Sequence, residues 1–117
     1  MKYSELVVWQ RAMDLVTAIY KTTSSFPVDE RFGLTSQVRR AAVSIPSNIA
    51  EGQGRKSTGA YINHLSIAYG SLMELETQIQ IALRLNFVEA EETTTLLAQT
   101  NEIGKMLSGL KNSLSTQ

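Results

Sequence analysis

The sequence predicts an all-α protein, an antiparallel up-down-up-down four-helix bundle. Apolar residues recur every three or four positions in four segments of the 117-residue chain, a spacing typical of amphipathic helices. The three breaks between the segments are short, so consecutive helices are expected to lie antiparallel side by side. The length suits one domain with its own core. We expect the helices at roughly 7–23, 34–51, 58–85 and 90–114.

The first helix is predicted from a wide apolar face made of two neighbouring stripes. One stripe consists of Leu6, Trp9, Met13, Val16 and Tyr20, and the other of Val8, Ala12, Leu15 and Ile19. The break Ser24-Ser25-Phe26-Pro27 ends the helix, because proline and the residue before it both disfavour helical backbone.

The second helix contains a proline, and we expect a kink there rather than an end. Pro46 lacks an N–H and presses on the carbonyl of Ala42, but the apolar period continues beyond it. Thr35 is the predicted N-cap. The glycines of Gly52-Gln53-Gly54 are expected to end the helix, since glycine accepts the left-handed conformation that often follows one.

The third helix has the clearest pattern, a heptad seam. The seam residues are Tyr61, Leu65, Ala68, Leu72, Leu75, Ile79 and Ala82. Ser57 or Thr58 can cap its start, and Asn86 can end it. Glu91 and Glu92 are expected in the first turn of the fourth helix, where the helix dipole favours carboxylates. The buried face of that helix is predicted to be Leu96, Ile103, Met106, Leu107, Leu110 and Leu114.

Apolar residues outside the seam of the third helix indicate self-association. They are Ile62, Ile67, Tyr69, Met73, Ile81 and Leu83. Surplus apolar surface on so small a bundle is usually covered by another subunit. Closer wrapping by the neighbouring helices of the same chain is the alternative.

The charge balance restricts the candidate functions. Eleven Lys and Arg match eleven Asp and Glu, so bulk positive charge does not argue for nucleic-acid binding. The halves differ, with eight basic and five acidic residues in 1–58, and three basic and six acidic residues in 59–117. Either the two halves pack against each other, or the first half forms a basic surface that oligomerisation concentrates.

Composition also points to the cytoplasm and away from membranes. The chain has no cysteine, which excludes disulfides and thiolate metal sites and suits a reducing compartment. We see no signal peptide and no apolar run of the roughly 20 residues that a membrane span needs.

No catalytic, cofactor or metal site is predicted, so we do not expect an enzyme. His64 is the only histidine, and it lies beside the seam without an Asp or Ser at a useful spacing, which is more typical of a structural histidine. The Glu-x-x-His motif of di-iron bundles is missing. Glu74-Leu75-Glu76 offers two carboxylates but not on one helix face. Gly52-Gln53-Gly54 lacks the strand and the third glycine of a dinucleotide site.

A polar block around Pro46 is the most informative feature. It contains Arg39, Arg40, Ser44, Ser47, Asn48, Glu51 and Arg55. Ser44 can return a hydrogen bond to the backbone that Pro46 loosens, and Asn48 and Glu51 share a helix face.

The arginines of this block allow two interpretations. Arg39 or Arg40 can pair with Glu74 or Glu76, from the third helix or from a neighbouring subunit, because guanidinium suits bidentate pairing with carboxylates. Alternatively, the basic residues meet phosphates, and these would be Arg39, Arg40, Arg55 and Lys56. Both can hold, since adjacent helical residues point about 100° apart.

A long motif runs through this block, Arg39-Arg40-Ala41-Ala42-Val43-Ser44-Ile45-Pro46-Ser47-Asn48-Ile49-Ala50-Glu51-Gly52. Shorter ones are Val8-Trp9-Gln10, Gly70-Ser71-Leu72, Glu74-Leu75-Glu76-Thr77 and Ile103-Gly104-Lys105-Met106-Leu107. Together they resemble the signature of a bacterial four-helix bundle family, first noticed as open reading frames within intervening sequences of 23S ribosomal RNA genes. The resemblance covers nearly the whole chain.

The resemblance implies a bundle that assembles as a ring of five, a homopentamer. A related protein, the accessory variability determinant of diversity-generating retroelements, has this architecture and binds nucleic acid and a reverse transcriptase through a basic surface. We therefore expect a non-enzymatic oligomeric scaffold that binds nucleic acid, RNA or DNA, with structured RNA or an RNA–protein complex as the expected target. The alternative is a protein-interaction module that docks a partner protein without nucleic acid.

Overall fold

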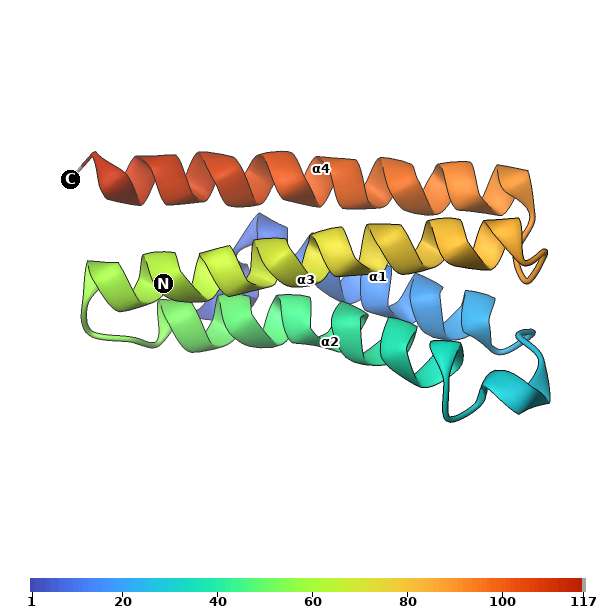
Figure 1. Ribbon diagram of the computed structural model, residues 1–117. Coiled ribbons are helices and arrows are strands. Elements are labelled where there is room, and N and C mark those ends of the chain that lie inside the picture. The colour runs from blue at the N-terminus through green and yellow to red at the C-terminus, as the bar shows by residue number, and fades with distance from the viewer. Residues whose placement is uncertain (117) are drawn as a thin grey trace.

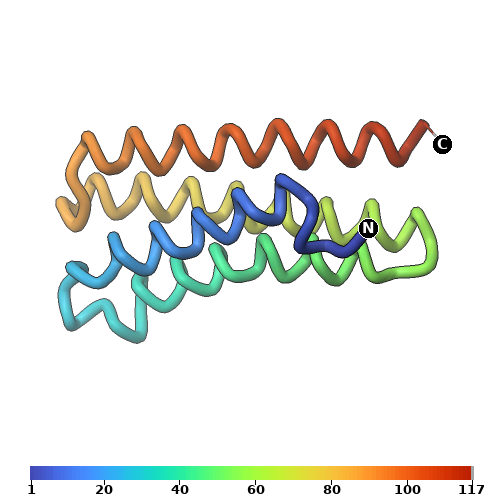
Figure 2. Tube along the Cα trace, turned by 180° about the vertical axis from the view of Figure 1, so that it is seen from behind, coloured from blue at the N-terminus to red at the C-terminus, as the bar shows by residue number. Residues whose placement is uncertain are grey.

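The computed structural model describes residues 1–116, and these form four α-helices with no strand among them (Figure 1). The helices are α1 (Val7–Thr23), α2 (Leu34–Gln53), α3 (Thr58–Arg84) and α4 (Ala90–Ser115), with 3-10 turns η1 (Tyr3–Glu5) and η2 (Val28–Glu30). Successive helices run antiparallel, and α1 and α3 each pack against both α2 and α4 (Figures 1 and 2). This arrangement confirms the predicted four-helix topology.

The core lies along the axis of the bundle and is built from most of the predicted apolar faces; on α1, however, Met13 and Tyr20 of the predicted first stripe are 41% and 44% exposed. The fully buried large side chains come from all four helices, and they include Leu15, Ile19, Ile45, Ile49, Leu65, Leu72, Leu75, Ile103 and Leu107. The heptad seam of α3 is buried except for Tyr61, which is half-buried. On α4, the last predicted core residues, Leu110 and Leu114, are also only half-buried.

The ends of α3 agree with the sequence prediction. At the start, the Ser57 hydroxyl accepts a hydrogen bond from the Ala60 N–H at 3.1 Å. At the end, Asn86 adopts the left-handed conformation with φ of 63°. The N–H of Asn86 donates to the Leu83 carbonyl, and the next N–H donates to the Ala82 carbonyl, which is the bonding pattern of a Schellman cap.

The predicted N-cap of α2 is wrong. Thr35 lies inside the first turn and is buried, and the capping position belongs to Gly33. The Leu34 N–H donates instead to the carboxylate of Glu30 at 3.0 Å. The turn that follows η2 places the Glu30 carboxylate over the first turn of α2. Apolar periodicity in the sequence does not reveal such a turn.

The structure confirms that α2 continues through Pro46 and ends within Gly52-Gln53-Gly54, at Gln53, but contradicts the left-handed conformation predicted for the glycines. Gly52 lies within α2, Gly54 has φ of −81°, and neither adopts the left-handed conformation. Gly52 is buried where α2 and α3 come close. An added Cβ there would lie 2.8 Å from the Cβ of His64 and 3.0 Å from Cδ1 of Tyr61. Gly52 therefore permits close helix packing.

Apolar residues outside the seam of α3 stay partly exposed, with Ile67 and Ile81 on one flank of the helix and Tyr69 and Met73 on the other, beside α4. Ile67, Tyr69, Met73 and Ile81 are 44%, 40%, 37% and 42% exposed. The neighbouring helices of this chain do not cover these four, whereas Leu83 packs against the core. Among residues 1–116, no helix has the length and apolar character needed to cross a membrane.

Candidate nucleic-acid interface

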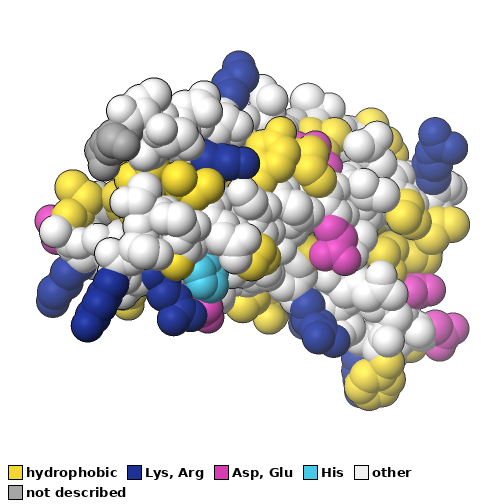
Figure 3. Space-filling view, turned by 60° about the vertical axis from the view of Figure 1, so that its left-hand side comes forward, with side chains coloured by type: hydrophobic (Ala, Val, Ile, Leu, Met, Phe, Trp, Pro, Cys, Tyr) yellow, Lys and Arg dark blue, Asp and Glu magenta, His cyan; other side chains and the backbone are white. Residues whose placement is uncertain are grey.

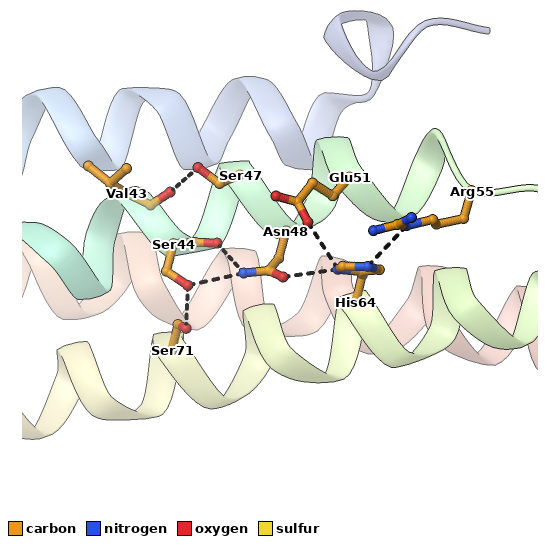
Figure 4. Close-up of polar contacts among 8 residues, drawn as sticks. All are labelled: Val43, Ser44, Ser47, Asn48, Glu51, Arg55, His64 and Ser71. Carbon is orange, nitrogen blue, oxygen red and sulfur yellow. Dashed lines mark hydrogen bonds and ion pairs between the residues drawn. The ribbon is translucent and has the colours of Figure 1, made fainter.

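A chain of polar side chains joins α2 and α3 next to Gly52 (Figure 4). The hydroxyls of Ser44 and Ser71 lie 2.8 Å apart. The Asn48 amide donates to the Ser44 hydroxyl at 3.1 Å and to its carbonyl at 2.9 Å. Asn48 Oδ1 lies 3.0 Å from Nδ1 of His64, and the Nε–H of Arg55 donates to Nε2 of His64 at 3.3 Å. Five side chains thus form one continuous path.

The partners of His64 define its tautomer. Arginine only donates hydrogen bonds, so Nε2 of His64 accepts from Arg55, and the ring proton is on Nδ1, where it is donated to Asn48. The carboxylate of Glu51 lies 3.8 Å from the same Nδ1. The His64 side chain is 14% exposed and that of Glu51 60% exposed. A ring with its proton on Nδ1 fits both hydrogen bonds, the one to Asn48 and the one from Arg55.

Ser44 has a different role from the predicted one. Its hydroxyl bonds to Ser71 and Asn48 and not to the backbone loosened by Pro46, because this face of α2 points at α3. Sequence analysis missed Ser71 as a member of the polar chain. Its spacing offered a signal, since Ser71 lies seven residues after His64 and so shares a face of α3, next to the apolar seam.

Arg39 faces α1. Its Nε–H donates to the Thr23 hydroxyl at 2.8 Å, and Nη2 contacts the Tyr20 carbonyl at 3.5 Å. The guanidinium carbon lies 4.5 Å from the centre of the Tyr20 ring, a cation–π geometry. Arg39 is half-buried by these contacts, so within the chain it joins α2 to α1 and does not pair with Glu74 or Glu76.

Arg40 points in another direction and is exposed. It lines a hollow of about 380 Å³ between α2 and α3, together with Glu74 and the two serines of the polar chain. Within residues 1–116 the ion pairs are Arg11–Glu102 at 3.2 Å and the His64–Glu51 contact, so the predicted pairing of Arg40 with Glu74 does not form inside the chain. Glu76 lines a separate groove between α3 and α4. Pairing with a neighbouring subunit stays a prediction.

Arg55 and Lys56 lie in the connection between α2 and α3, at the end of the bundle that also holds the N-terminus and the end of α4 (Figures 1 and 2). The Gln53 side chain contacts the Met1 carbonyl there. We define the basic end as Lys2, Arg55, Lys56 and Lys111, all of them exposed.

The two ends of the bundle carry opposite charge. Two carboxylates lie close to cations of the basic end: Glu5 accepts a hydrogen bond from the Lys2 N–H, and Glu51 and Arg55 both contact His64. Figure 3 shows dark blue side chains gathered beside the single histidine, at the lower left of the view. The opposite end holds five carboxylates and four cations, which are Asp29, Glu30, Glu89, Glu91 and Glu92 with Lys21, Arg31, Arg39 and Arg84. The zero net charge therefore conceals a separation of charge along the long axis.

No group of three His, Cys, Asp or Glu side chains within residues 1–116 is arranged to hold a metal ion. Burial raises the pKa of the Tyr61 hydroxyl above its usual value. The arrangement can instead present cations to a polyanion at one end and hold α2 and α3 together beneath them.

Comparisons with known proteins agree with this fold. The family model described as "23S rRNA-intervening sequence protein" matches residues 4–109. The chain is also similar to a protein of unknown function from the S23 ribosomal protein family of Bacteroides thetaiotaomicron, whose crystal structure was determined at 1.70 Å. The two share 25% identity with a TM-score of 0.81, over 90% of this chain and 98% of the other. No curated protein matches the chain. The chain belongs to the 23S rRNA-intervening sequence protein family.

Proposed function

We propose that this protein is a non-enzymatic oligomeric scaffold that binds nucleic acid through its basic end. RNA is the first candidate ligand. The separation of charge along the bundle supports the proposal, because it presents four exposed cations on one end of a chain whose net charge is zero. Long cationic side chains that remain free in solution are suited to phosphate contacts, which supply most of the sequence-independent affinity for nucleic acids.

We rank the four predicted phosphate contacts by the exposure and the partners of their side chains. Lys56, exposed at the basic end, leads the ranking, followed by Arg55, which is also exposed but donates to His64. Arg40 is exposed but shares its hollow with the carboxylate of Glu74, which repels phosphate. Arg39 already donates to α1, so we expect it to contribute least. In a ring of five, each contact would be repeated around one axis, which would strengthen a weak single-chain interaction.

The test is a salt series with labelled RNA and DNA. We expect log K to fall linearly with log salt concentration, with a slope of about −0.7 to −0.9 for each phosphate that a Lys or Arg neutralises. The double variant Arg55→Ala/Lys56→Ala should reduce that slope. The matched control is Arg31→Ala/Arg84→Ala, which removes two exposed cations from the opposite end. Salt-insensitive binding, or an equal loss in both double variants, would refute the basic end as the interface.

A protein-docking module is the second candidate, and the partly exposed apolar residues of α3 favour it. Ile67, Tyr69, Met73 and Ile81 can be covered by a second copy or by a partner protein. Light scattering on the same samples would give the mass, and a pentamer would be about five times the 12.9 kDa of the chain. Two results together would favour docking. The oligomer would bind no nucleic acid at low salt, and a pull-down would retain a partner protein after nuclease treatment and in high salt.

A further inference from the structure

His64 lies between two charged side chains that would respond in opposite ways to its protonation (Figure 4). Arg55 donates to its Nε2 at 3.3 Å, and the carboxylate of Glu51 lies 3.8 Å from its Nδ1. Glu51 is the only carboxylate among residues 1–116 that comes within 4 Å of the ring nitrogens. On α3 itself, Tyr61 precedes His64 by one turn, and its hydroxyl is neutral between about pH 5 and about pH 8, since a tyrosine pKa is ordinarily about 10 and burial raises that of Tyr61 further.

The neutral imidazole restrains Arg55. Its Nε2 lone pair accepts the Arg55 Nε–H, while Nδ1–H is held by Asn48, so the ring cannot turn without losing a bond. Arg55 is otherwise exposed and belongs to the basic end. Its guanidinium is therefore held against α3 by a single neutral acceptor.

Protonation removes that acceptor. Imidazolium donates from both nitrogens, so its Nε2–H would face the Arg55 Nε–H, donor against donor, with two positive charges in contact. The Nδ1–H bond to Asn48 persists, and Glu51 gains an attraction to the ring. Moving away from His64 into solvent then lowers the free energy of the Arg55 side chain.

We propose that His64 is a positioning residue whose protonation releases Arg55 for phosphate, so that RNA binding at the basic end tightens as the pH falls. This inference rests on the proposed function. Histidine changes charge between about pH 5 and pH 8, whereas Lys, Arg and Glu side chains ordinarily keep their charges above about pH 5.5. One additional phosphate contact raises affinity about tenfold at a salt concentration of about 50 mM.

The binding experiment uses a labelled oligouridylate, whose bases do not titrate in this range, at about pH 7.5 and about pH 5.5. The wild-type chain should gain about tenfold or more in affinity at the lower pH, with a steeper salt slope. His64→Gln should show no gain, because glutamine offers similar hydrogen bonds without a titrating charge. Arg55→Ala should retain only the smaller gain from the imidazolium charge. A full gain in His64→Gln, or no gain in the wild type, overturns the inference.

A second measurement needs no RNA. His64 is the only histidine, so its C2 proton gives one NMR signal that reports its titration. The chemical shift of the Arg55 Nε–H proton should move from its hydrogen-bonded value to that of a solvated guanidinium. The midpoint of this change in pH should equal the midpoint of the His64 signal. An Arg55 signal that does not change through the His64 titration overturns the release. RNA that fails to bind at either pH would refute the proposed function and the pH-dependent affinity. If the His64 and Arg55 signals still move together in that case, the coupling between the two side chains is nevertheless supported.

Discussion

Replacing Gly52 by alanine should destabilise the protein, although alanine is the better helix former. The new Cβ would lie 2.8 Å from the Cβ of His64, 3.0 Å from Cδ1 of Tyr61 and 3.3 Å from the Tyr61 carbonyl oxygen. The Cβ of His64 is bonded directly to the backbone, so no side-chain rotation relieves the contact. Ordinary contact begins near 3.4 Å, and α2 and α3 must therefore separate by about 0.6 Å here.

The magnitude follows from three contributions. Overpacking of this kind costs about 1–3 kcal/mol. Exchanging glycine for alanine inside a helix returns about 1 kcal/mol. Pushing α3 away also stretches the hydrogen bond between His64 and Asn48, which is worth about 1 kcal/mol. We expect a net loss of about 1–3 kcal/mol in the free energy of unfolding, or a fall in Tm of roughly 4 °C per kcal/mol for a chain of this length.

Urea denaturation followed by circular dichroism measures the change, at equal protein concentration so that the proposed self-association does not bias the comparison. The matched control is Gly70→Ala, in the interior of α3, where an added Cβ meets nothing within 4 Å. This control should gain about 0.5–1 kcal/mol. If Gly52→Ala is as stable as the wild type or more stable, the close approach of α2 and α3 is not real.

Three further predictions follow from burial and contacts. Arg39→Ala should lose about 1 kcal/mol of stability by breaking its contacts with α1, whereas Arg40→Ala should change stability by less than about 0.5 kcal/mol. Equal losses for the two variants in denaturant unfolding would contradict the different roles given to the two arginines. Ile45→Asp or Leu72→Asp should unfold the bundle, since each side chain is fully buried and an unpaired carboxylate there costs several kcal/mol; a cooperative melt at the wild-type temperature would refute this burial. Because the pKa of Tyr61 is raised, the folded state retains a proton that the unfolded state loses, so the free energy of unfolding should fall as the pH rises above about 10. Denaturation curves of Tyr61→Phe should show a smaller fall over the same pH range.

The helices and most of the core could be predicted because they depend on local periodicity. The heptad spacing of α3 placed Leu65, Leu72 and Leu75 in the core, since an apolar stripe on a helix has only one way to leave water. The caps at Ser57 and Asn86 followed from side-chain chemistry that acts within a few residues. The long motif of α2 was also enough to indicate the family, which the match over residues 4–109 shows.

The partners of polar side chains could not be predicted, because they depend on which helix faces which. The sequence showed that Arg39 and Arg40 point in different directions, but only the packed bundle placed Arg39 on α1 and Arg40 over the hollow beside Glu74. The cap at Glu30 likewise depends on the turn that η2 makes.

The sequence by itself determined a small all-helical bundle with surplus apolar surface and no evident catalytic group. Only the tertiary structure decided that Gly52 is a packing residue, that His64 and Ser71 belong to one polar chain, and that the cations of the α2–α3 connection lie with Lys2 and Lys111 at one end. The physical reason is range. Helix formation and burial of an apolar stripe are governed by neighbours within one or two turns, whereas close helix approach and charge separation arise from residues that are distant in sequence and meet only in the folded chain.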